Sequence, residues 1–182
     1  MKTLETKRLI LRLWKESDLD DLFEYASTPG VGEMAGWPHH TDKEVSRSIL
    51  KSFIENGDVY AVVLKENDKV IGSLGIHNRT DPDYKADVQR EIGYVLSKIY
   101  WGMGLAAEAV EEAIKYAFEE LKADVLWCCH FTTNPQSKRV IEKTGFKFYR
   151  DGVFEAKLLG KVFDDKKYII TRSDYQANSH NK

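Results

Sequence analysis

The sequence predicts a single α/β domain built on one mixed, largely antiparallel sheet of about seven strands. Its 182 residues suit one domain, and a domain of that size buries a core without disulfides or metals. Strand-like and helix-like segments follow one another along the chain, and the run at 125–131 has no polar face, which is typical of a central strand. We expect the domain to span residues 1–173 and the polar tail, 174–182, to be disordered.

Apolar patterns predict the strands. Residues 8–13 alternate, with Leu9, Leu11 and Leu13 on one face, as in a half-buried strand. A polar turn joins two further runs as a hairpin. Including these, the expected strands lie at 8–13, 60–64, 70–76, 90–96, 125–131, 146–154 and 167–171.

Helical periodicity and capping residues predict four helices. The first begins at Ser17, taken as the capping residue, and the second begins at a capping box, 41–44. In the third, apolar residues recur every four positions over 105–121, opposite a face rich in glutamate. The fourth starts at Asn134, which proline follows at the first helical position, and ends at Gly145.

Charge and cysteine content exclude several classes of protein. The chain carries 27 Lys+Arg against 29 Asp+Glu, which argues against a protein built to bind nucleic acid or an anionic membrane. Residues 1–14 are too charged for a signal peptide or a membrane span, so we expect a cytoplasmic protein. The adjacent Cys128 and Cys129 are expected to be packed thiols, and the five histidines show no metal-ligand spacing, so no metal is expected.

Two glycines, Gly102 and Gly104, form a turn between a strand and the clearest helix. A helix start presents unpaired N–H groups and a positive dipole end, so we expect an anion, a phosphate, at 102–107; a tight turn before a core helix is the alternative. The spacing to Ala107 matches the dinucleotide pattern, but it lies mid-chain, well past the strand end. Because no Lys-Ser/Thr follows the glycines either, nucleotide binding is the weaker interpretation.

At this point the chain resembles the GNAT-family N-acetyltransferases, in the branch related to ribosomal-protein N-terminal acetyltransferases (RimJ/RimL-like). The resemblance covers about residues 3–173. Six segments carry it in order, namely 6–12, 70–72, 90–94, 101–109, 134–141 and 145–146. One position departs from the general GNAT pattern, because Ile99 stands where a Gln or Arg is usual.

The resemblance implies that acetyl-CoA is the cosubstrate, with its diphosphate at 102–107. It also implies that the strand ending at Leu96 pairs with the pantetheine arm and splays from the strand starting at Val125. The backbone N–H of Val95 is expected to donate to the thioester oxygen. The cofactor-binding residues that the resemblance implies are Val95, Leu96, Trp101, Gly102, Met103, Gly104, Leu105, Ala106, Ala107, Asn134, Ser137, Lys138 and Arg139.

Acetyl transfer to an amine needs a group that takes a proton from the amine and a group that gives one to the leaving thiolate. We expect Glu91 to be the base, with a solvated glutamate and a water chain as the alternative and His77 as a substitute. The resemblance assigns the acid to Ser137, because the Tyr used by many GNAT enzymes falls at Ile141 here. The alternative for Ser137 is that it satisfies N–H groups of the first helical turn.

The expected reaction is direct transfer in a ternary complex, without a covalent intermediate on cysteine. The favoured acceptor is a protein or peptide N-terminus, and a small amine (polyamine, amino acid or antibiotic) comes second. Trp37, His39, His77 and Glu91, with the loop 78–86, are expected to shape the acceptor site. A non-catalytic acyl-CoA sensor is the alternative from another class, and a homodimer is left open.

Overall fold

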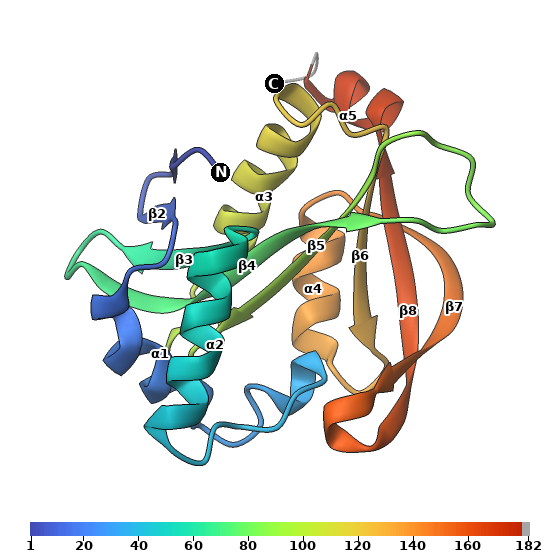
Figure 1. The fold of residues 1–182 in the computed structure, drawn as a ribbon. Helices are drawn as coiled ribbons and strands as arrows, with labels where there is room; N and C mark the ends of the chain where they lie inside the picture. The colour runs from blue at the N-terminus through green and yellow to red at the C-terminus, as the bar shows by residue number, and fades with distance from the viewer. Residues whose placement is uncertain (180–182) are drawn as a thin grey trace.

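The computed structural model describes residues 1–179 and shows an eight-stranded sheet with helices on both faces (Figure 1). The strand order is β1-β2-β3-β4-β5-β6-β8-β7, and the β5–β6 pair alone is parallel. The predicted fold class is therefore confirmed. The strand beyond the expected seven is β1, whose two residues are too few to form a pattern in the sequence.

The strands lie close to their predicted positions, although β4 and β8 are longer. Their bounds are β1 (Leu4–Glu5), β2 (Leu9–Arg12), β3 (Val59–Leu64), β4 (Lys69–Arg79), β5 (Gln89–Leu96), β6 (Val125–Phe131), β7 (Lys147–Ala156) and β8 (Lys161–Thr171). The helices are α1 (Leu19–Ala26), α2 (Lys43–Asn56), α3 (Leu105–Glu119), α4 (Pro135–Lys143) and α5 (Arg172–Ser179). Four short 3-10 turns complete the described chain, at Glu16–Asp18, Glu33–Ala35, Lys98–Tyr100 and Lys157–Leu159.

The first two helices are capped differently from the prediction. The carboxylate of Asp42, not Thr41, accepts two backbone N–H groups of the first turn of α2, at 2.9 and 3.0 Å. Ser17 lies inside the 3-10 turn before α1. There the buried Asp18 pairs with Arg12 at 2.8 Å, so an ion pair anchors the chain entering α1.

The C-terminal segment forms α5, although the sequence predicted a disordered tail from residue 174. The carboxylate of Asp174 accepts the backbone N–H of Thr171 at 3.2 Å and pairs with Lys147. The ring of Tyr175 stacks on Phe118 with 4.8 Å between the centroids. These contacts with distant residues hold a polar helix that has little helical pattern of its own; residues 180–182 of the expected tail lie outside the described part.

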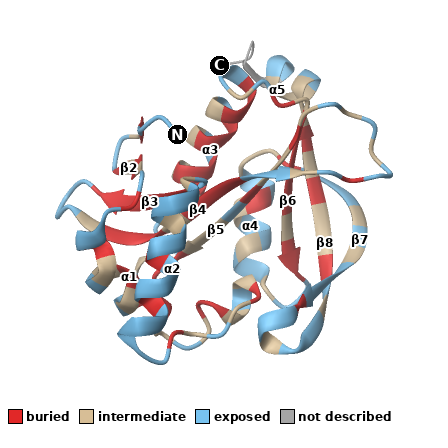
Figure 2. Cartoon of the chain, viewed as in Figure 1, coloured by how far each residue is buried: buried red, intermediate tan, exposed pale blue. Residues whose placement is uncertain are grey.

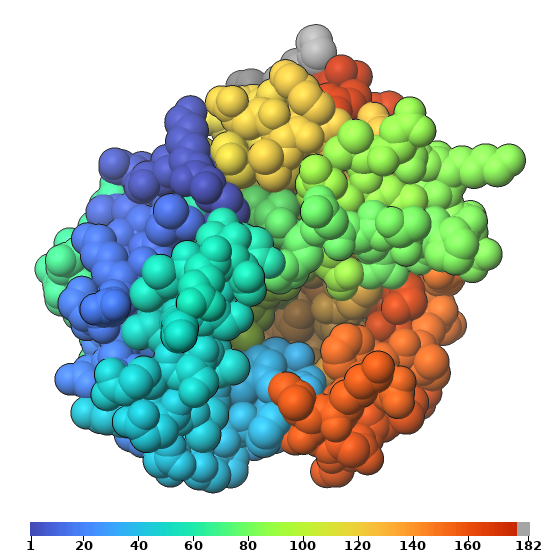
Figure 3. Space-filling model, in the orientation of Figure 1, coloured from blue at the N-terminus to red at the C-terminus, as the bar shows by residue number. Residues whose placement is uncertain are grey.

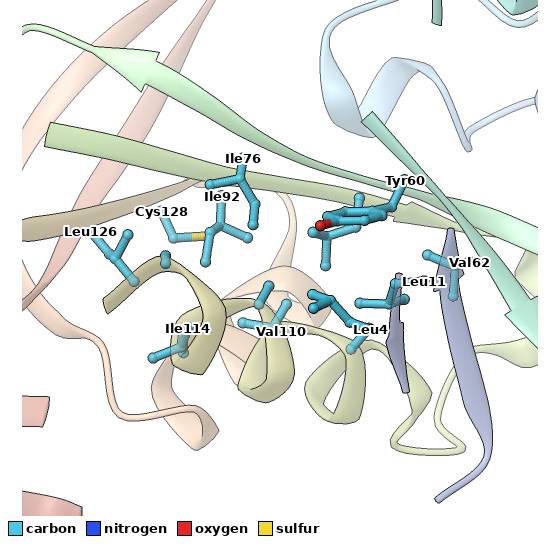
Figure 4. Close-up of a cluster of buried hydrophobic side chains, with 14 of the residues drawn as sticks. Leu4, Leu11, Tyr60, Val62, Ile76, Ile92, Val110, Ile114, Leu126 and Cys128 are labelled. Carbon is cyan, nitrogen blue, oxygen red and sulfur yellow. The ribbon is translucent and has the colours of Figure 1, made fainter. Parts of the chain in front are cut away.

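Hydrophobic side chains form one cluster on each face of the sheet. Figure 2 marks the buried residues of the strands and of α3 in red. The larger cluster lies between the sheet and α3, where Ile92 and Cys128 point toward Val110 and Ile114 (Figure 4). The smaller cluster packs α1 and α2 against the opposite face. The apolar stripe predicted for α3 is thus the buried side of that helix.

The sheet opens in its middle, between β5 and β6. These strands pair only at Gln89–Val125, Arg90–Leu126 and Glu91–Trp127. Beyond those pairs β5 stays on β4 through Leu96, and β6 stays on β8 through Phe131. The two halves of the sheet therefore diverge, which confirms the predicted splay and leaves two strand edges facing each other (Figure 1).

Candidate functional site

A cavity of about 690 Å³ occupies the opening between β5 and β6. Side chains alternate between the two faces along a strand. Tyr94 and Cys128 line the cavity from the face covered by α3 and α4, whereas Glu91, Cys129 and Phe131 line it from the other face. The cavity therefore runs through the sheet. Figure 3 shows one mouth as a hollow between the blue segment before α2, the green β4–β5 region and the orange β7–β8 hairpin.

The glycine turn and the start of α3 form one end of the cavity. Gly102 and Gly104 have φ angles of +78° and +75°, a region that glycine adopts without strain. A Cβ added at Gly102 would meet nothing within 4 Å, so space remains beside the turn. No described side chain caps α3, and the N–H groups of its first turn have no acceptor within the helix. This end can therefore hold an anion, whereas Met103 is 54% exposed and lies outside the lining.

Glu108, in the first turn of α3, ties the glycine turn to the N-terminal segment. Its carboxylate accepts from the Thr6 hydroxyl at 2.6 Å, from the Arg8 backbone N–H at 2.8 Å and from Arg8 Nε at 2.7 Å. The same Arg8 donates from Nη1 to the carbonyl of Met103 at 3.0 Å. Burial alone would raise the pKa of Glu108, but the bonds from Thr6 and Arg8 outweigh it and lower that pKa. The segment around Arg8 thus fixes the turn in place.

The backbone of β5 offers N–H groups to the opening, but not the one expected. Ser97 donates to the carbonyl of Ile71 at 2.8 Å, which fixes the hydrogen-bonding phase of the regular β4–β5 ladder. Along an antiparallel strand the N–H groups alternate between its two edges. The N–H of Val95 therefore points toward β4, and those of Tyr94 and Leu96 point toward β6. The expected donor, the N–H of Val95, is therefore wrong. A shift of one residue along the strand reverses the edge toward which an N–H group points.

Ser137 lies beside the opening at the start of α4. Its hydroxyl is 3.0 Å from the hydroxyl of Tyr94, which also donates to the Ser137 carbonyl at 3.2 Å. Burial raises the pKa of Tyr94. Asn134 caps the helix by accepting the Ser137 N–H at 3.1 Å, and Ile141 is fully buried in the core. The structure thus pairs Ser137 with a phenol from β5 that the sequence did not single out.

Glu91 lies on the other face, and Arg79 of β4 holds it. Nη1 of Arg79 pairs with Oε2 of Glu91, and the guanidinium lies 4.4 Å from the centroid of the Trp127 ring. His77 is paired with Glu91 across the ladder, as expected, but its ring contacts Asp58 at 3.3 Å and does not line the cavity. Arg79 is therefore the partner of Glu91, and its identity depends on a strand register that the sequence does not show.

Both cysteines are free of disulfide bonds, and burial keeps their thiols protonated. Burial and the nearby Glu91 raise the pKa of Cys129 to about 12, and burial raises the pKa of Cys128. A thiol in this state is a poor nucleophile at neutral pH. Among residues 1–179 there is also no group of three His, Cys, Asp or Glu side chains arranged to hold a metal. No described helix could cross a membrane.

Two residues expected at the acceptor site, Trp37 and His39, lie outside the cavity lining. The ring of Trp37 packs 5.3 Å from that of His40, and His39 bonds to Glu33 at 2.7 Å. Neither Trp37 nor His39 lines the cavity. The same loop instead contributes Gly30, Val31, Met34 and Ala35 to the lining.

The cations near the cofactor end also differ from the expected set. Lys138 points away from the cavity and pairs with Glu142 at 3.7 Å, whereas Arg139 and Lys143 line the cavity. Lys98 also lines the cavity, and its ammonium group donates to the carbonyl of Pro29. Trp101 donates from Nε1 to the carbonyl of Leu96 at 2.8 Å and packs against the core. The expected residues that line the cavity are Val95, Leu96, Trp101, Gly102, Gly104, Leu105, Ala106, Ala107, Asn134, Ser137, Arg139 and Glu91.

Known proteins are similar to this chain in sequence and in architecture. A family model described as "Acetyltransferase (GNAT) domain" matches residues 8–147. The "Uncharacterized N-acetyltransferase p20" of Bacillus licheniformis is 28% identical over 182 residues, which cover 96% of this chain and 99% of that protein. The crystal structure of a GNAT-family acetyltransferase from Bacillus anthracis has a TM-score of 0.81 at 24% identity and covers 94% of this chain and 99% of its own. That of the ribosomal-protein-S5-alanine acetyltransferase from Vibrio fischeri has a TM-score of 0.73 at 20% identity, over 96% and 98% of the two chains. The chain therefore belongs to the GNAT family of N-acetyltransferases, which use acetyl-CoA as cosubstrate.

Proposed function

We propose that this chain transfers the acetyl group of acetyl-CoA directly to a primary amine, preferably the N-terminal amine of a protein or peptide. The observation that carries the proposal is the cavity through the sheet, which joins the unpaired N–H groups of α3 to Glu91 on the opposite face. The sequence resemblance to ribosomal-protein N-terminal acetyltransferases favours a polypeptide acceptor over a small amine.

The lining of the cavity fits an extended ligand with a diphosphate. The start of α3 offers N–H groups beside open space at Gly102, and Arg139 and Lys143 add positive charge. Deeper along the cavity, Nδ1 of His130 donates to the carbonyl of Phe131 at 2.8 Å, so Nε2 keeps a lone pair. That nitrogen is buried without a partner, and an amide N–H of a bound ligand would satisfy it.

The side chains around the opening supply the required proton transfers. Bound acetyl-CoA would provide the activated acyl group. Glu91 takes a proton from the amine, directly or through water, while Arg79 keeps its carboxylate in place. The N–H of Tyr94 stabilises the charge that develops on the thioester oxygen. Ser137 gives a proton to the leaving sulfur as an N–C bond replaces the C–S bond. Solvent then takes the amine proton from Glu91 and restores a proton to Ser137, so the net products are the amide and the CoA thiol.

The experiment is a measurement of CoA thiol release with acetyl-CoA and a panel of acceptors. The panel contains short peptides with free N-termini, the same peptides with blocked N-termini, free amino acids and a polyamine. The proposal predicts release with free N-termini, together with a mass increase of one acetyl group on the peptide. Binding of acetyl-CoA in calorimetry without thiol release for any acceptor would instead identify an acyl-CoA sensor.

A further inference from the structure

The mouth of the cavity on the Glu91 face of the sheet is bounded, at the end of β6, by an aromatic wall made of Phe131 of β6, Phe154 of β7 and Phe163 of β8. The rings of Phe131 and Phe163 stack with 4.4 Å between centroids and 10° between planes, and Phe154 lies 5.5 Å from Phe131. Phe131 and Phe154 line the cavity, and Phe163 supports them from behind. The wall is therefore a fixed apolar surface.

The loop before α2 forms the opposite side of the mouth. A Cβ at Gly36, whose φ is +91°, would lie 2.7 Å from the ring of Phe154, so the loop packs directly on the wall. From the same loop Met34, which is 41% exposed, and Ala35 line the cavity. The hollow in Figure 3 lies between these two surfaces. A group entering here meets apolar side chains on two sides.

Both carboxylates at this mouth have a cationic partner. Among the described residues that line the cavity, Glu91 and Asp165 are the carboxylates. Glu91 pairs with Arg79, and Oδ2 of the buried Asp165 pairs with Lys167 at 3.0 Å, whereas Oδ1 of Asp165 is buried without a hydrogen-bond partner. An acceptor that carries several ammonium groups would find no carboxylate without a cation beside it. An acidic acceptor would lose solvation against the apolar rings of the wall.

We propose that the aromatic wall is an acceptor subsite that selects a primary amine bearing an apolar substituent next to the nitrogen. This rests on the proposed function and names the chemical class of its acceptor. The substituent is either the first side chain of a peptide or the hydrocarbon part of a free arylalkylamine. Hydrophobic pockets discriminate by roughly 10- to 200-fold per missing methylene, so the preference should be measurable.

The test compares acceptors that differ only in this substituent. One arm uses a peptide whose first residue is Leu, Phe, Asp or Lys, and the other compares phenethylamine with spermidine. The expected kcat/KM is about tenfold or more higher for Leu or Phe than for Asp or Lys, and for phenethylamine than for spermidine. The arm with the higher kcat/KM shows whether the physiological acceptor is a peptide or a free amine.

The variant Phe154→Ala tests the wall itself, and Val153→Ala is the matched control. Phe154 is 42% exposed, so its removal leaves the core intact, and Val153, the preceding residue of β7, is 65% exposed and outside the cavity. Phe154→Ala is expected to raise the KM for the apolar acceptor about tenfold, with the KM for acetyl-CoA unchanged, and Val153→Ala to change neither.

Faster acetylation of spermidine or of the Asp and Lys peptides would overturn the subsite while leaving the acetyltransferase in place. An unchanged KM in Phe154→Ala would overturn it too. Binding of acetyl-CoA without turnover of any acceptor would overturn both this inference and the proposed function.

Discussion

Replacing Gly102 with Ala should have two separate effects. It should lower the stability of the fold, and it should also weaken the binding of CoA. At a φ of +78° an alanine is strained by about 1–2 kcal/mol, although its Cβ meets no protein atom within 4 Å. The Cβ instead occupies the open space beside the α3 N–H groups. Loss of one charge-assisted hydrogen bond there costs about 1.5–3 kcal/mol, which raises the Kd for CoA roughly 10- to 100-fold.

Two control variants separate backbone strain from ligand contact. The φ angles of Gly57 and Gly145, +61° and +90°, lie on either side of the φ angle of Gly102. A Cβ at either position also meets nothing within 4 Å. Gly57→Ala and Gly145→Ala should lose similar stability in urea unfolding but keep the Kd for CoA in calorimetry. S-acetylpantetheine, which lacks the diphosphate, should be an equally good donor for Gly102→Ala and the wild type. A wild-type Kd for CoA in Gly102→Ala would refute the phosphate assignment.

Three further predictions concern the acid, the anchor of the turn and the cysteines. Ser137→Ala should lower kcat about 100- to 10,000-fold with an unchanged Kd for CoA; a wild-type kcat would remove Ser137 from the proton transfer. Glu108→Gln should lower the free energy of unfolding by about 1–3 kcal/mol at pH 7. Because folding lowers the pKa of Glu108, this difference should shrink as the pH falls below 4.5, the ordinary value, and a constant difference in urea titrations would contradict the reasoning. Cys129→Ala should keep its kcat, and mass spectrometry should show slow alkylation of Cys129 at pH 8, because its pKa is about 12; loss of turnover would reopen a thiol intermediate.

Local patterns in the sequence were enough to predict the sheet, α3 and the glycine turn. The apolar stripe of α3 and the unbroken run of β6 depend on which face is buried, and that information is present in each segment alone. The splay and the roles of Glu91 and Ser137 came from the resemblance. The structure confirms the splay and places both residues in the cavity.

Features that depend on register or on distant contacts were beyond the sequence. The direction of the Val95 N–H reverses with a shift of one residue in hydrogen-bonding phase. Arg79 meets Glu91 only because the β4–β5 hairpin extends to Arg79, past the apolar run that predicted the strand. Tyr94 reaches Ser137 across the opening, and 43 residues separate them in the chain. Likewise α5 depends on Phe118 rather than on its own polar sequence.

The brevity of the β5–β6 pairing has a consequence for the mechanics of the molecule. Three residue pairs at one end of the opening form the β5–β6 ladder between the two halves of the sheet. Past that point no backbone pairing joins the two edges, and the halves are connected through side chains, such as Tyr94 with Ser137 and the core packed on α3. A ligand bound between β5 and β6 and hydrogen-bonded to both edges would replace the backbone hydrogen bonds that the two strands do not make with each other. Occupancy of the opening should therefore strengthen the connection between the two halves and raise the free energy of unfolding of the domain.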